Sequence, residues 1–135
     1  MKKHIGSNGQ SLAELALILP LLLLVVMGVF DLGRGIFYFS TIQNAAREGA
    51  RFGAVDHCNS SGIQNAVQTF AFGLLDDLEI NDEIIYYDGI PERVVVTVTY
   101  EFDTVTPLIG EFFGDGSIQL TSKARQIIES ASACP

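Results

Sequence analysis

Leu15–Phe30 decides the architecture of this chain, because its sixteen residues, LALILPLLLLVVMGVF, carry no charge. A helix rises about 1.5 Å per residue, so this run is about 24 Å long, slightly short of a bilayer core. A turn or more added at each end completes the span, with Glu14 and Asp31 near the two interfaces. We therefore predict a transmembrane helix over about residues 12–36.

Two other interpretations of this run are a buried helix of a soluble domain and a cleaved secretory signal. A helix that is apolar on all sides needs a larger shell of protein than the rest of the 135 residues supplies. Lys2 and Lys3 suit a secretory signal, but no A-x-A-type cleavage site follows Phe30. The two lysines predict a cytoplasmic N-terminus and an exported C-terminal part, although Arg47 and Arg51 on the exported side count against this orientation.

The charge of the chain is concentrated beyond this helix. The net charge is −8, and residues 57–135 carry twelve acids against three bases, which makes that part about −9. An acidic domain repels phosphate backbones. We therefore expect no nucleic-acid partner.

Three regions follow from these patterns. Residues 1–9, MKKHIGSNG, form a basic leader, and residues 10–55 form one long helix. The turn-rich sequence DHCNSSG then opens an extracytoplasmic α/β head at residues 56–135. The fold class is α+β: a long N-terminal transmembrane helix, then a small domain with one amphipathic helix packed on a roughly three-stranded antiparallel sheet.

The second half of the long helix carries small residues three or four positions apart, which places them on one face. A narrow stripe of this kind allows a neighbouring element to approach closely. We assign helix packing to Ala46, Gly49, Ala50 and Gly53.

The head shows one helical and three strand-like patterns. Apolar residues at helical spacing predict a helix N-capped by Ser60 or Ser61, and they are Ile63, Val67, Phe70, Leu74 and Leu78. Strands are expected at Glu83–Tyr87, Arg93–Phe102 and Ser117–Ile128. The acidic stretch 76–83 is interpreted as a solvated turn, and Asp88-Gly89 as a hairpin signal whose loop Pro91 makes longer than two residues.

Cys58 and Cys134 flank the head. They are either two unrelated thiols or a disulfide, and export favours the disulfide. His57 beside Cys58 does not make a nucleophile–base pair, because adjacency in sequence does not supply the orientation. We expect no catalytic residue, metal or cofactor.

The head of the apolar run carries a motif of its own. Gly9 is followed five residues later by Glu14, directly before the hydrophobic helix and after a short basic leader. This is the pattern of class III, prepilin-type signal sequences. Cleavage after Gly9 would free the α-amino group of Gln10, and Glu14 would lie at the edge of hydrocarbon, where a carboxylate needs a partner. The other interpretation is a flexible Gly9 and an interfacial Glu14.

The chain resembles the TadE-like family, the pseudopilins of the tight adherence (Tad, Flp, type IVc) pilus system. The resemblance rests on Gly9-Gln10-Ser11, Glu14, the leucine run around Pro20, Asp31, Gly33-Arg34, Ala45–Arg51, residues 94–102, Thr106-Pro107-Leu108 and residues 118–124. The family usually has an aromatic residue after the glutamate, whereas this chain has Leu15.

The resemblance implies a non-enzymatic minor pilin or pseudopilin of a pilus that serves cell adhesion. It would be inserted in the cell membrane by its N-terminal helix and would reach the surface pilus after assembly. Its partners would be the membrane, other pilin subunits, a prepilin peptidase and the Tad secretion platform. The alternative is a permanently anchored, unprocessed envelope protein whose exported head binds a partner or ligand.

Overall fold

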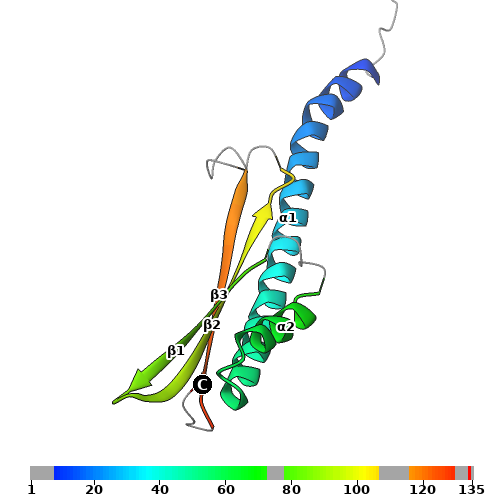
Figure 1. Cartoon of the computed structure of the whole chain (residues 1–135). Coiled ribbons are helices and arrows are strands. Elements are labelled where there is room, and N and C mark those ends of the chain that lie inside the picture. Colours follow the sequence, from blue (N-terminus) through cyan, green and yellow to red (C-terminus); the bar gives the residue numbers. More distant parts are fainter. Residues whose placement is uncertain (1–7, 73–77, 107–115, 130–133, 135) are drawn as a thin grey trace, which may run out of the picture.

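The computed structural model describes residues 8–72, 78–106, 116–129 and 134. In chain order the elements are α1 (Asn8–Val55), α2 (Ser60–Phe70), β1 (Leu78–Tyr87), β2 (Ile90–Asp103) and β3 (Ser117–Ile127). Figure 1 shows one long helix whose C-terminal half lies along a small sheet, with α2 beside its end. The predicted α+β fold class is confirmed.

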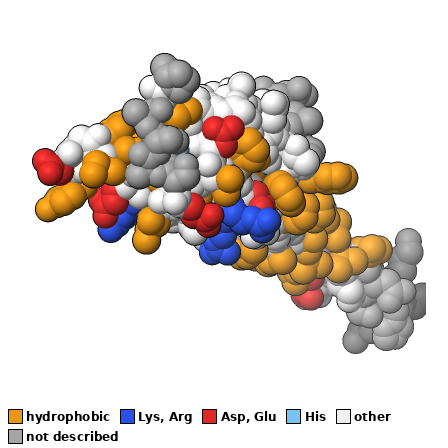
Figure 2. All heavy atoms as spheres, turned by 60° about the horizontal axis from the view of Figure 1, so that its bottom comes forward, with side chains coloured by type: hydrophobic (Ala, Val, Ile, Leu, Met, Phe, Trp, Pro, Cys, Tyr) orange, Lys and Arg blue, Asp and Glu red, His pale blue; other side chains and the backbone are white. Residues whose placement is uncertain are grey.

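α1 is a single helix of 48 residues that continues through Pro20. Its N-terminal half extends beyond the sheet without a neighbouring element (Figure 1). Hydrophobic side chains cover much of this extension in Figure 2. From Asp31 onward one face of α1 is covered by the head, because Asp31, Ile42 and Ala45 are buried whereas Phe30 and Leu32 are exposed.

The sheet has the strand order β1-β2-β3, and both pairs are antiparallel. Val94, Val96 and Val98 of β2 are fully buried. On the other face, Thr97 and Thr99 are only partly covered and Val95 is 6% exposed. The predicted alternation along residues 93–102 is therefore confirmed. It follows from the two-residue repeat of a strand, which directs every second side chain to the core.

β1 begins at Leu78, so the turn expected across residues 76–83 is wrong from Leu78 onward; residues 76 and 77 lie outside the described part. Leu78, Ile80 and Ile84 line the half-buried face of the strand, and Asp82 takes the remaining position on that face. The Asp82 carboxylate accepts a hydrogen bond of 2.7 Å from the hydroxyl of Ser60 on α2. The alternation of apolar residues in this strand is interrupted by Asp82, and for that reason the sequence did not indicate a strand beginning at Leu78.

The hairpin between β1 and β2 has a loop of two residues, Asp88 and Gly89, because Tyr87 pairs with Ile90. The expectation of a longer loop is wrong. Asp88 and Gly89 have φ of 52° and 78°, the left-handed backbone that a tight hairpin turn requires. Pro91 is accommodated at a register irregularity of the β1–β2 pair, before the described pairing with β3 begins at Arg93.

α2 is shorter than its apolar spacing suggested. It ends at Phe70, which is half exposed, and Leu78 belongs to β1; Leu74 lies outside the described residues. The N-cap is Asn59 and neither serine, since the Asn59 side chain accepts a hydrogen bond of 2.9 Å from the N–H of Gly62.

The core lies between α1 and the inner face of the sheet. α1 packs along β2 and β3, whereas α2 packs mainly on α1 and reaches the sheet at β1. Ile63 and Val67 of α2 complete the core and are fully buried. The long helix is thus part of the head over its C-terminal half and an exposed apolar rod over its N-terminal half.

Candidate functional site

The residues assigned to prepilin processing lie in the first two turns of α1. Gly9, Gln10 and Glu14 are exposed, and among the described residues a Cβ placed on Gly9 would meet nothing within 4 Å beyond its own stretch of helix. Within the part of the chain that the structure describes, no ion pair involves Glu14. The backbone around Gly9 is therefore open to another protein, and Glu14 can pair with a cation from outside the chain.

The apolar residues that follow are exposed on every side of the helix. Leu17 is 80% exposed, and Leu21 and Phe30 are 65% exposed. A core helix of a soluble domain would bury these side chains. Among the described residues, the helix spanning Gly9–Val55 is long and apolar enough to cross a membrane.

Asp31 marks the junction between the exposed rod and the head. Its carboxylate is buried and accepts hydrogen bonds from the backbone N–H groups of Val105, at 3.1 Å, and Thr106, at 2.8 Å. The guanidinium of Arg34, one turn along the helix, lies 3.7 Å from the same carboxylate. One buried charge is thus held by two amides and a cation, as a buried charge requires.

Aromatic rings surround the exposed side of this junction. The Arg34 guanidinium lies 5.2 Å from the ring centroid of Phe102 and 5.7 Å from that of Tyr38. Tyr38 in turn packs against Tyr100 with a centroid distance of 5.2 Å. The junction couples α1 to the end of β2 through both polar and apolar contacts.

Sequence reasoning did not single out this junction. Asp31 was placed at a membrane interface, and its partner amides lie 74 and 75 residues later in the chain. The available signal was an Asp and an Arg three residues apart, Asp31 and Arg34, at the end of the apolar run. That spacing predicts an ion pair along one helix face and gives no information about the distant loop.

The small residues assigned to helix packing lie inside the head. Ala46 and Ala50 are buried, and Gly49 and Gly53 face α2 and β2. A Cβ on Gly53 would approach Val94 to 2.9 Å and Ile63 to 3.1 Å. These residues therefore set the close approach of α1 to its own domain.

The exposed apolar helix, with its open Gly9 and Glu14, is the part of the chain that comparison with known families recognises. Residues 9–51 match the family model of TadE-like proteins. Comparison with curated proteins and with solved structures finds no match. The resemblance inferred from the sequence is thus confirmed over this range.

The TadE-like segment lies entirely within α1. It includes the processing motif, the exposed apolar rod, the Asp31 junction and most of the small-residue face, and it ends at Arg51, before the head's own helix and strands begin. The family match therefore describes the helix and its junction.

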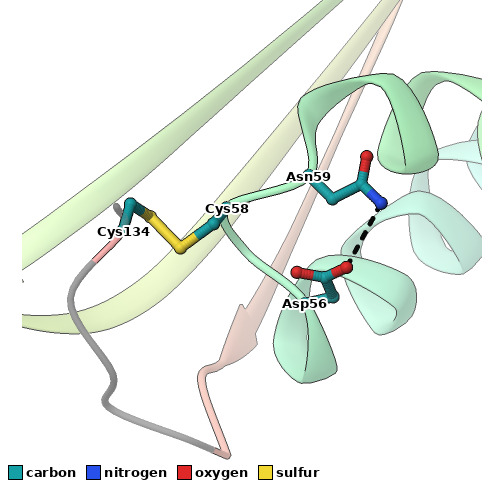
Figure 3. Close-up of a disulfide and its surroundings, with 4 residues drawn as sticks. All are labelled: Asp56, Cys58, Asn59 and Cys134. Carbon is teal, nitrogen blue, oxygen red and sulfur yellow. Dashed lines mark hydrogen bonds between the residues drawn. A yellow bond between two sulfur atoms is a disulfide. The ribbon is translucent and has the colours of Figure 1, made fainter.

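A disulfide joins Cys58 and Cys134 (Figure 3). It lies at the end of the head opposite the exposed apolar rod (Figure 1). It ties the turn after α1 to the C-terminal end of the chain. The same turn is held by a hydrogen bond of 3.2 Å from the Asn59 amide to the Asp56 carboxylate. Beyond β3, the N–H of Glu129 donates to the carbonyl of Ala54 at 2.9 Å. The chain end is therefore fastened to the end of α1.

Among the described residues, one group could offer three ligands to a metal ion: His57, Cys58 and Cys134, whose donor atoms lie within 4.8 Å of one another. Both sulfur atoms are committed to the disulfide, and a metal ligand has to be a thiolate. In the oxidised protein this group therefore offers no thiolate ligand to a metal ion.

Proposed function

We propose that this protein is a minor pilin or pseudopilin that takes part in assembly of a Tad (Flp, type IVc) pilus. The observation that carries the proposal is the TadE-like segment, residues 9–51, which coincides with an apolar helix left uncovered by its own head. An uncovered rod of this kind needs a bilayer or the helices of other subunits around it.

In this proposal about residues 12–36 cross the membrane, with the N-terminus in the cytoplasm and the head outside. Lys2 and Lys3 favour that orientation. The buried Asp31 junction then lies at the outer interface, where the head shields its charge from lipid. A disulfide in the head agrees with an oxidising compartment.

Residues 1–9 act as the leader in this proposal, and a prepilin peptidase cleaves after Gly9. The open surroundings of Gly9 support access by such an enzyme. Gln10 then carries a free α-amino group, and other pilin subunits, the membrane and the Tad secretion platform are the partners. The acidic head gives no reason to add nucleic acid to them.

The test combines cell fractionation with intact mass of the protein. A pseudopilin should co-purify with sheared surface filaments or with the secretion platform, and its mature form should begin at Gln10. Gly9→Val should block maturation, because its side chain crowds the cleaved bond, whereas Gly6→Val in the same leader should not. Protein that begins at Met1 and stays in the membrane fraction would instead identify a permanently anchored envelope protein whose head binds a partner.

A further inference from the structure

Charges on the outer face of the sheet, the face away from α1, are sorted by strand. One row across the sheet runs from Glu83 on β1 through Val95 on β2 to Arg125 on β3. The next row runs from Asn81 to Lys123. Acidic side chains therefore lie along one edge strand and basic side chains along the other. The β2 residues between them in these two rows, Val95 and Thr97, are uncharged, whereas the charged residues of this face of β2, Arg93, Glu101 and Asp103, lie toward its two ends.

The acidic edge is β1. Glu79 and Glu83 are exposed on its outer face, and the partly exposed Asp82 lies between them on the inner face. β1 carries no basic residue. In the described part of the chain, none of these three carboxylates forms an ion pair.

The basic edge is β3 together with the adjoining face of α1. Lys123 and Arg125 are exposed on β3, and Arg47 of α1 joins them along an open groove of about 380 Å³. Within the described residues, these three cations form no ion pair.

Within the described residues, no ion pair joins the two edges of the sheet. Neighbouring strands are about 4.8 Å apart, so β1 and β3 are separated by about 10 Å across β2. In the described chain no further strand lies beyond either edge. Two copies placed side by side with their sheets in the same orientation bring β3 of one copy next to β1 of the other.

We propose that the basic β3 edge of one copy binds the acidic β1 edge of a second copy in a head-to-tail contact. Lys123 and Arg125 meet the carboxylates of Glu79, Asp82 and Glu83, and Arg47 borders the groove that receives them. The contact rests on the proposed function, in which the apolar rod packs among the helices of other subunits, and it adds that a neighbouring subunit is a second copy of this chain.

An alternative explanation of these charges is that they prevent edge-to-edge aggregation of the sheet. Prevention by repulsion calls for the same sign on both edges, because edges of opposite sign attract. The arrangement found here disfavours β1–β1 and β3–β3 contacts and favours only the β1–β3 contact. A contact between two different edges is head-to-tail. It gives a closed ring when the rotation between successive copies closes on itself, and an open helical filament when it does not.

A zero-length carbodiimide crosslink tests the contact in the full chain, held in nonionic detergent micelles. Lys123 is the single lysine after the two in the leader, so an amide bond to it reports its neighbours specifically. We mix chains of natural isotopic composition with ¹⁵N-labelled chains. We expect a crosslink from Lys123 of one isotope to Glu79 or Glu83 of the other. Lys123→Arg, which keeps the charge, should abolish the crosslink and leave self-association unchanged.

Charge reversal provides the second measurement. Lys123→Glu with Arg125→Glu should weaken self-association about ten-fold, and Glu79→Lys with Glu83→Lys should do the same, because attractive pairs become repulsive. A mixture of the two variants should associate again, since one acidic and one basic edge face each other. This recovery also shows that both variants fold.

Crosslinks confined to one chain, crosslinks of Lys123 to acids outside β1, or reversals that leave association unchanged would overturn the contact. Failure of the proposed β1–β3 contact can be distinguished from failure of the proposed function. A chain that matures at Gln10 and enters sheared filaments without the Lys123 crosslink contradicts the contact alone. A chain that crosslinks as expected and never leaves the membrane fraction contradicts the pilus assignment.

Discussion

The backbone N–H of Thr106 donates a hydrogen bond of 2.8 Å to Oδ2 of Asp31, a residue 75 positions earlier in the chain. The N–H of Val105 donates to Oδ1 of the same carboxylate at 3.1 Å. Asp31 therefore fastens the loop after β2 to α1 at the point where the exposed apolar rod ends. At the other end of the head, Glu129 is bound to Ala54. The head is held to one helix at both of its ends.

Asp31→Asn should loosen the first of these attachments. An amide side chain offers one acceptor and one donor group, so the N–H of Val105 or Thr106 loses its buried acceptor, at a cost of about 2 kcal/mol in the free energy of unfolding. Denaturant unfolding of the full chain in micelles measures the loss, and hydrogen exchange should quicken at the two amides. Asp103→Asn, an exposed acid on β2, is the control. Equal amide protection in both variants would contradict the role of Asp31.

Gly49 offers a test of how closely α1 approaches the head. A Cβ at this position would overlap Cγ2 of Val67 and lie 3.3 Å from Cγ1 of Val96, and valine side chains have little freedom to move away. Gly49→Ala should therefore destabilise the head by about 1–3 kcal/mol. Gly33→Ala is the matched control, because its Cβ meets nothing within 4 Å and alanine favours a helix. If both variants unfold at the same denaturant concentration, the close approach at Gly49 is unimportant.

The disulfide should make a measurable contribution to stability. Cys58 and Cys134 are 76 residues apart, and closing a loop of that length stabilises the fold by about 4 kcal/mol in the chain-entropy model. The double variant Cys58→Ser/Cys134→Ser should lose about that amount. Reductant should lower the stability of the natural chain to the same value, add the mass of two hydrogens, and leave the double variant unchanged. A reductant effect on the double variant would show that something other than this bridge had been measured.

The sequence predicted the elements whose periodicity is undisturbed. The uncharged run Leu15–Phe30 predicts a membrane helix, and the alternation along residues 93–102 predicts a strand with one face toward the core. The small residues around Gly49 also indicated a face for close packing. In each case a local pattern carries the information, because burial in a helix or strand repeats with the element's own period.

The missed features depend on contacts that no local pattern records. β1 was predicted to begin at Glu83, because Asp82 interrupts the apolar face and its partner, Ser60, lies on another element. The Asp31 junction requires a loop 75 residues away. The sorting of charge between β1 and β3 becomes visible only with the register that aligns Glu83 with Arg125 across the sheet.

Glu14 provides the test of the rod in assembly. Its carboxylate is exposed at the edge of the apolar run, where an unpaired charge is costly, and within the described chain no ion pair satisfies it. In the proposed function, the freed α-amino group of a neighbouring subunit's Gln10 is the cation that pairs with Glu14. The Glu14→Gln variant should therefore insert into the membrane normally. Its amount in sheared filaments should fall about ten-fold, which corresponds to the loss of one contact of about 1.4 kcal/mol. Glu48→Gln, on the head-bound part of the same helix, should enter normally. Equal incorporation of both variants would rule out this pairing.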